Sequence, residues 1–282
     1  MYEASDSTLS TFTASDGDNL AVQDWPLPDG LGLRGVVLLV HGLGEHAGRY
    51  DPVARRLNSW GFAVRGYDHY GHGESNGVRG SLPVPARLID DLADVMDSTR
   101  SRMDPSLPMI LLGHSMGGLV AASLVALGQF RVEALVLSSP ALKPRLSRFQ
   151  KLLLDLVPRF APNLTLGNGL NPDFISHDPD VVKAYRNDPR VHDRISARLA
   201  RFITDGGPGV IARAREWKVP TLLMYAGADQ LVDPAGSRAF AAAAPADIVM
   251  SVCFPDLFHE IFNELDSEPV FDTLKQWLDA RF

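Results

Sequence analysis

The sequence predicts an α/β fold, in which a mostly parallel sheet carries helices on both faces. Two observations indicate this class. Short apolar runs recur along the chain, several of them apolar at nearly every position, as expected for strands buried on both faces; they span 35–40, 62–68, 109–112, 134–137, 221–225 and 248–254. Helical patterns alternate with most of these runs across short links, an order typical of a doubly wound parallel sheet.

The elements can be justified in chain order. Residues 8–25 hold two short alternating runs joined by Ser-Asp-Gly-Asp-Asn, which predicts a hairpin of two edge strands. Apolar residues at helical spacing predict helices over 50–60, 83–103, 119–125, 235–244 and 269–282.

The alternation of strand-like and helical segments stops between residues 141 and about 215. No strand-like run is visible there, and prolines interrupt helical pieces at 144, 158, 162, 172, 179, 189 and 208. The strand pattern resumes at Pro220. We therefore interpret 141–215 as a helical cap inserted into a single domain that spans 1–282.

Composition narrows the possible functions. A net charge of −7 argues against general nucleic-acid binding, which needs a basic face. No run of about 18 apolar residues predicts a spanning helix, and the polar start lacks a signal-peptide pattern, although one could have been removed. The single Cys253 excludes an internal disulfide and favours a reducing, cytoplasmic setting. Because Cys253 lies in an apolar run, we expect a buried structural thiol.

The chain is organised around Ser115. It lies in Gly113-His114-Ser115-Met116-Gly117, between an apolar run and a helical pattern. This is the strand–turn–helix context of the G-x-S-x-G nucleophile elbow, where the two glycines leave room for close packing. The motif alone is common, and Ser115 could simply cap a helix.

A serine hydroxyl needs an adjacent base to become a good nucleophile. Of the histidines after Ser115, His177 and His192 lie in the cap, and His259 alone follows a strand. The chain order nucleophile, acid, histidine of this architecture makes His259 the expected base.

Asp229 is the expected partner of that base. It alone among the later acids directly follows a strand of the predicted parallel sheet, and it would orient the imidazole and stabilise its charged form. Asp233, one short turn later, is the alternative. Asp256 is too close to His259 in sequence to reach the ring from behind.

Two backbone N–H groups are expected to form an oxyanion hole. They belong to Met116, directly after the nucleophile, and to Leu43, in the glycine-rich loop after the strand 35–40. The nearby histidines are expected to bond to backbone in tight loops, and without a cysteine or paired carboxylate they complete no zinc set; they are His41, His69 and His72.

Four separated motifs then resemble a known family. The segments 41–46, 68–75, 113–118 and 259–264 look like those of the monoacylglycerol lipases and related lysophospholipases of the α/β-hydrolase superfamily. The resemblance implies the α/β-hydrolase fold, a helical cap (a lid) over the site, and hydrolysis of single-chain lipid esters without metal or organic cofactor. Ser115, Asp229 and His259 match its triad, and Leu43 and Met116 its oxyanion positions.

The resemblance also suggests substrate contacts. Glu45 and Arg49 match positions near which the glycerol head group is handled. Phe262 stands where some members carry a second histidine that touches the head group, which weakens the case for strict glyceride selectivity.

The start of the cap is basic and amphipathic. Residues 141–160 carry five basic side chains and one acidic one among many apolar residues; the charged ones are Lys143, Arg145, Arg148, Lys151, Asp155 and Arg159. Such a segment can lie on an anionic lipid surface. It can equally pack its apolar side over the site with its charges in water.

Rival functions remain open. A general carboxylesterase or a lysophospholipase is the nearest alternative, and a peptidase ranks lower because nothing marks a site for a free amine. A dehalogenase or epoxide hydrolase would need an aspartate in place of Ser115. A binding protein that kept the fold without catalysis usually has a damaged triad.

Overall fold

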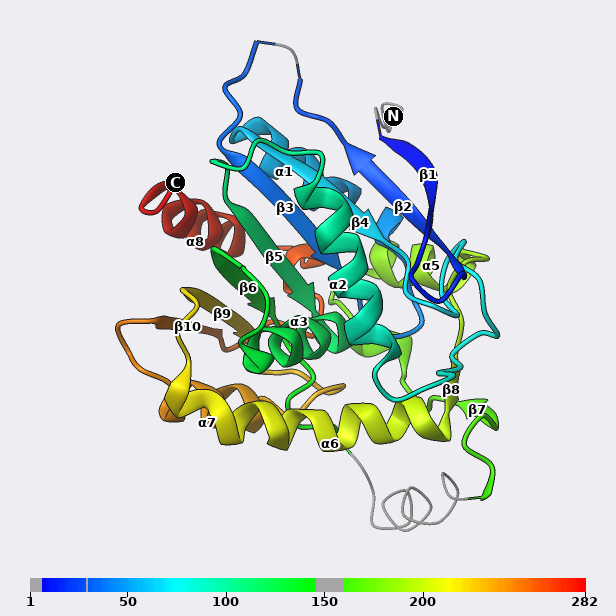
Figure 1. Ribbon diagram of the computed structural model, residues 1–282. Helices are drawn as coiled ribbons and strands as arrows, with labels where there is room; N and C mark the ends of the chain where they lie inside the picture. The colour runs from blue at the N-terminus through cyan, green and yellow to red at the C-terminus, as the bar shows by residue number, and fades with distance from the viewer. Residues whose placement is uncertain (1–6, 29, 146–159) are drawn as a thin grey trace.

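The computed structural model of the protein describes residues 7–28, 30–145 and 160–282 (Figure 1). A twisted eight-stranded sheet with the order β1-β2-β4-β3-β5-β6-β9-β10 crosses the molecule. Its strands are β1 (Thr8–Thr13), β2 (Asn19–Trp25), β3 (Gly35–Val40), β4 (Phe62–Tyr67), β5 (Met109–His114), β6 (Ala134–Ser138), β9 (Thr221–Ala226) and β10 (Val249–Phe254).

Parallel pairing dominates this sheet. The six strands β3 to β6, β9 and β10 pair in parallel, whereas β2 is antiparallel to both β1 and β4. The predicted fold class is therefore confirmed. The predicted hairpin also forms, but only β1 lies at the edge, because β2 pairs on its other side with β4.

Helices cover both faces, as the alternation of strand and helix predicts. One layer contains α2 (Arg87–Arg100), α3 (Ser115–Leu127), α6 (Ala197–Arg213) and α7 (Ala235–Ala243); the other contains α1 (Asp51–Ser59) and α8 (Glu268–Asp279) (Figure 1). Strand β3 shows why both layers are needed. Its Leu38 and Val40 join the first apolar core and its Val37 and Leu39 the second, since successive side chains point to opposite faces.

Between β6 and β9 the chain builds a separate layer over one end of the sheet. It contains β7 (Thr165–Gly167), η2 (Pro172–Phe174), α5 (Pro179–Asn187), β8 (Arg194–Ser196) and the start of α6; η3 (Ala214–Glu216) follows α6 and packs beside α7. The short antiparallel pair β7–β8 corrects the expectation of a strand-free segment. Pro172 and Pro179 begin their helices, where a missing N–H costs nothing.

Two further expectations are corrected. Pro208 does not interrupt a helix, because α6 runs through it for 17 residues. Cys253 is exposed rather than buried, because β10 is an edge strand whose residues partly face solvent. The amphipathic segment proposed for lipid surfaces lies largely at 146–159, outside the described residues. Within the described parts of the chain, no helix has the length and apolar character needed to cross a membrane.

Candidate active site

Ser115 lies at the sharp turn between β5 and α3. It is the first residue of α3, and its φ of 53° is in the left-handed region that non-glycine residues rarely occupy. The two flanking glycines explain how the turn fits. A Cβ at Gly117 would lie 2.0 Å from the carbonyl oxygen of Val40, and one at Gly113 would lie 2.6 Å from that of Gly117. The turn therefore has the strand–helix geometry that the motif predicts.

His259 and Asp229 are brought together from loops 30 residues apart. Asp229 follows β9 and His259 follows β10, and His259 Nδ1 donates to Asp229 Oδ2 at 2.6 Å. The other carboxylate oxygen of Asp229 accepts the N–H groups of Leu231 and Val232 at 2.8 and 2.9 Å. Both side chains are buried, so the carboxylate holds the ring in one orientation.

This pairing shifts the pKa values of His259 and Asp229 in opposite directions. Burial disfavours the charged ring, but the Asp229 carboxylate outweighs it and raises the pKa of His259 above its ordinary value. Burial likewise acts to raise the pKa of Asp229, yet His259 and the two backbone donors lower it. Asp229 therefore stays ionised near neutral pH. The alternative acid, Asp233, instead pairs with Lys143 at 2.8 Å.

A cavity of about 350 Å³ lies in front of Ser115. Its floor includes Ser115, His259, Leu43 and Met116, so the expected nucleophile, base and oxyanion residues face one space. Apolar side chains from the cap form much of its wall; they are Leu170, Ile175, Val191, Ile195 and Ile203. An apolar pocket with a few convergent polar groups is the usual form of a small-molecule site.

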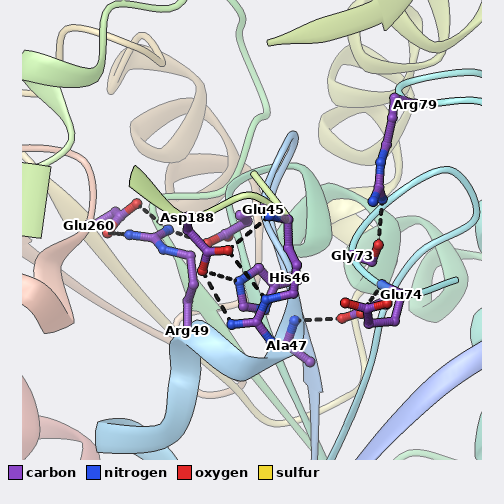
Figure 2. A network of polar contacts seen from close by, with 11 residues as sticks. Glu45, His46, Ala47, Arg49, Gly73, Glu74, Arg79, Asp188 and Glu260 are labelled. Atoms are coloured by element: carbon purple, nitrogen blue, oxygen red, sulfur yellow. Dashed lines mark hydrogen bonds and ion pairs between the residues drawn. The ribbon is translucent and has the colours of Figure 1, made fainter. Parts of the chain in front are cut away.

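The three residues expected to contact substrate have different positions. Glu45 lines the cavity. Arg49 lies behind it, where its guanidinium donates to Glu45 and to both oxygens of Glu260 (Figure 2). Phe262 is buried in the second core with its ring 5.2 Å from that of Phe271. Arg49 and Phe262 are therefore not among the described residues that line this cavity, since ion pairing holds the first and core packing the second.

The loop histidines bond to backbone, as expected. His41 Nδ1 donates to the carbonyl oxygen of Gly42, His69 Nε2 to that of His41, and His72 Nδ1 to that of Tyr70. Their rings and that of His192 contact one another in a chain, with centroids 4.4 to 6.0 Å apart. Within the described residues, no cluster of histidine, cysteine and acidic side chains is arranged to hold a metal ion.

Sequence reasoning missed three neighbours of the site. His114 lies with its ring centroid 4.7 Å from that of His259 and bonds to Ser138 Oγ. Burial and the neighbouring His259 lower the pKa of His114 to about 4. Glu260 and the cap residue Tyr185 also line the cavity. His114 directly precedes Ser115 and Glu260 directly follows His259, so the sequence motifs could have pointed to both. No sequence pattern marks Tyr185.

Comparison with known proteins agrees with this geometry. The family model described as "Serine aminopeptidase, S33" matches residues 32–266. A monoacylglycerol lipase of Mycolicibacterium smegmatis is 36% identical over 248 residues, which are 87% of this chain and 88% of that protein. A phospholipase of Bacillus subtilis is 31% identical over 250 residues, 86% of this chain and 95% of that protein.

A solved structure extends the comparison to three dimensions. The crystal structure of a monoacylglycerol lipase from Paleococcus ferrophilus has a TM-score of 0.81 and 35% identity, covering 90% of this chain and 97% of that one. The sequence comparison and the structural comparison therefore each match about nine tenths of this chain. The chain belongs to the monoacylglycerol lipase family of serine hydrolases, with the α/β-hydrolase fold.

Proposed function

We propose that this enzyme hydrolyses carboxylic esters of single-chain lipids, monoacylglycerols first among them, with Ser115 as nucleophile. The observation that carries the proposal is the common cavity of Ser115 and His259, with His259 bonded to the ionised Asp229 behind it. The names of the most similar relatives support the substrate class.

The reaction would proceed by two acyl transfers. Ser115 Oγ attacks the ester carbonyl while His259 takes its proton, and Asp229 stabilises the imidazolium that forms. The N–H groups of Leu43 and Met116 hold the oxyanion. His259 then protonates the leaving alcohol, and water attacks the acyl-enzyme by the same route in reverse, releasing the fatty acid.

Labelling and turnover together test this assignment. A fluorophosphonate probe should label the wild-type chain and leave a Ser115→Ala variant unlabelled. The same variant should lose at least about 10³-fold in kcat on a p-nitrophenyl ester. Labelling that persists in Ser115→Ala would contradict the choice of nucleophile, and an unlabelled wild type would favour a non-catalytic binding protein.

A second candidate substrate is a lysophospholipid. Arg145 and Arg186 line the cavity, and Arg145 is exposed while it donates to the carbonyl oxygen of Asp229 at 2.8 Å. An arginine at the entrance can contact a phosphate. Hydrolysis rates for a monoacylglycerol and a lysophosphatidylcholine of equal acyl length separate the candidates. We expect the monoacylglycerol to be faster, and Arg145→Gln to slow the lysophospholipid more than the monoacylglycerol, since the loss of the bond to Asp229 affects both substrates.

Contact with lipid surfaces is proposed for another part of the cap. Large apolar side chains are exposed between residues 160 and 174, next to the cavity lining that Leu170 provides; they are Phe160, Leu164, Leu166, Leu170 and Phe174. Neighbouring exposed apolar side chains mark interaction sites, and a lipid substrate enters from an aggregate.

Vesicle co-sedimentation tests this contact. A Leu164→Ser/Leu166→Ser variant should bind phosphatidylcholine vesicles more weakly than wild type. Leu9→Ser, which removes an equally exposed leucine from β1, should leave binding unchanged. Equal binding by all three proteins would refute the membrane contact without touching the ester-hydrolase assignment.

A further inference from the structure

Three charged side chains form a buried ion-pair network beneath the cavity. Arg49 donates to Glu45, and its Nη1 and Nη2 donate to the two oxygens of Glu260 at 2.7 and 2.8 Å (Figure 2). All three are largely shielded from water, with side-chain exposures of 11% for Arg49, 5% for Glu45 and 7% for Glu260. A charge buried to this degree is costly unless it is well paired, so this geometry constrains each member.

Each carboxylate holds a different part of the site. Glu45 Oε1 accepts the N–H of Gly42 at 2.6 Å and the hydroxyl of Tyr50 at 2.7 Å. Gly42 directly precedes Leu43, whose N–H is the proposed oxyanion donor. Glu45 therefore fixes the loop that follows β3.

Glu260 holds the other side of the site. It directly follows His259, its N–H donates to the carbonyl oxygen of Ile175 in the cap, and its side chain accepts from Asn263 at 2.8 Å. Arg49 thus joins two loops whose residues are 211 positions apart in the chain. One loop carries the oxyanion donor and the other carries the base.

We propose that Arg49 is a positioning residue that sets the placement of the His259 loop relative to the oxyanion loop, through Glu260 on one side and Glu45 on the other. The proposal rests on the proposed function, since it assumes the roles of Leu43 and His259. Misplacement of reacting groups by about 1 Å can cost about 100-fold in rate, so such a device has a large effect on catalysis.

The contacts of Arg49 favour positioning over direct substrate binding. Its two terminal nitrogens are engaged by carboxylates, and the ring of Tyr185 covers its guanidinium at 4.7 Å. The cavity wall in the described residues includes Glu45 and Glu260, with Arg49 behind them. Only the planar fork of arginine can bind one carboxylate with two parallel bonds and reach a second, so lysine is a poor substitute.

The network also acts on His259 electrostatically. The groups that face its ring are Asp229, Glu260 and Glu45, which favour the protonated form, and His114, which opposes it. Replacing the Glu260 carboxylate with an amide of the same shape removes one of these negative charges. The pKa of His259 should then fall, an effect that a purely structural role for Glu260 would not produce.

The experiment compares Arg49→Lys and Glu260→Gln with a matched control. The control is Arg55→Lys. Arg55 lies in the neighbouring helix α1 and pairs with Asp51 at 2.7 Å in a half-exposed position. Full-length proteins are assayed on a short-chain monoacylglycerol, which carries the glycerol head group that a substrate contact would need, for kcat, KM and the pH profile of kcat/KM. Thermal unfolding is followed for each variant.

We expect kcat to fall about 10- to 100-fold in Arg49→Lys and Glu260→Gln, with KM changed less than about 3-fold, and no change in Arg55→Lys. Glu260→Gln should in addition move the acid limb of the profile to lower pH. A rise in KM at unchanged kcat would make Arg49 a substrate contact and overturn the proposal. Wild-type kcat in both variants, or an unmoved acid limb in Glu260→Gln, would also overturn it.

Two further comparisons separate a failure of the positioning role from a failure of the proposed function. Should Arg49→Lys unfold, Glu260→Gln decides alone, because the amide keeps the size and one acceptor of the carboxylate. Fluorophosphonate labelling of wild type and Ser115→Ala reports separately on the proposed function. If that labelling fails, the ester-hydrolase mechanism is wrong; if only the positioning variants behave like wild type, the mechanism stands and the role of Arg49 is wrong.

Discussion

At the residue scale, Asp229 carries two tasks with its two oxygens. Oδ1 accepts the N–H groups of Leu231 and Val232, which fixes the carboxylate, and Oδ2 accepts from His259. A hydrogen-bonded and ionised carboxylate of this kind selects the ring tautomer whose Nε2 carries no proton, which the proposed role of His259 as base requires.

Asp229→Asn should therefore lower kcat by about 10³- to 10⁴-fold while KM stays within a few-fold, because the amide can hold the wrong tautomer. Steady-state kinetics on p-nitrophenyl butyrate measure both constants. The control is Asp233→Asn, which removes the alternative acid, paired with Lys143 at the surface. A larger loss in Asp233→Asn than in Asp229→Asn would reverse the assignment.

The pH dependence of activity follows from the same pair. In the proposed mechanism His259 acts as a base only when neutral, and the Asp229 carboxylate raises its pKa above the ordinary value of 6.5. Activity should thus be present at high pH and be lost as pH falls through a midpoint above 6.5. Profiles of kcat/KM between pH 5 and 9 with an uncharged ester test this expectation. A midpoint well below 6.5 would mean that burial outweighs Asp229.

At the scale of elements, the elbow depends on how closely α3 approaches β3. Gly117→Ala would place a methyl group 2.0 Å from the carbonyl oxygen of Val40 and 2.4 Å from that of His41. Backbone must move, so we expect destabilisation by about 2–4 kcal/mol and loss of activity, because Ser115 and the loop after β3 shift together.

Gly209→Ala is the matched control for this change. Gly209 lies within α6, and its added methyl group would meet no atom within 4 Å. Alanine favours a helix over glycine by about 1 kcal/mol, so this variant should be neutral or slightly more stable. Urea unfolding of both variants measures the contrast. Equal stabilities would show that the elbow tolerates a wider separation of α3 and β3.

The sequence predicts the elements of the sheet well and those of the cap poorly. Strands β3, β5, β6 and β9 are buried at every position, so their apolar runs were unambiguous. The strands β7 and β8 have three residues each and leave no periodic signal. Helix α6 continues through Pro208 because packing against α3 and α7 outweighs local propensity.

The candidate site shows the same division. The three expected triad residues each follow the carboxyl end of a parallel strand: Ser115 follows β5, Asp229 follows β9 and His259 follows β10. Topology and chain order therefore bring them together. The pair of Arg49 and Glu260 depends on side-chain placement across 211 positions, which no local pattern encodes. The burial of Phe262 was not predictable for a related reason: its expected role followed from a motif position, whereas its burial depends on packing against α8.

At the scale of the whole molecule, the cap is hydrogen-bonded to both the loop of the proposed oxyanion donor Leu43 and the loop of the proposed base His259. His192 N–H donates to the carbonyl oxygen of Gly44 at 2.9 Å, and His46 pairs with Asp188 at 2.8 Å (Figure 2). On the other side, Glu260 N–H donates to Ile175 at 2.8 Å. These contacts connect the cap directly to the loop of the proposed oxyanion donor and to the loop of the proposed base.

The chain of histidines lies along one of these connections, and we expect it to make the folded state sensitive to acid. Burial lowers the pKa of His41 and of His192 to about 4, and it lowers the pKa values of His69 and His72 as well. Between pH 6.5 and about 4 the unfolded chain binds protons that the folded chain does not. The contribution of these four histidines to the free energy of unfolding should therefore fall as pH falls through this window.

Unfolding by urea at pH 7.0, 6.0 and 5.0 should show this decline, and His72→Phe should reduce its slope. The variant keeps an aromatic ring between those of His41 and His192, 5.4 and 4.7 Å away, and it removes one proton-binding site. It also loses the bond to Tyr70, so its stability at pH 7 should be lower by about 1 kcal/mol. The slope is therefore the quantity to compare. A His72→Phe curve parallel to that of wild type would assign the acid sensitivity to carboxylates instead of to this histidine chain.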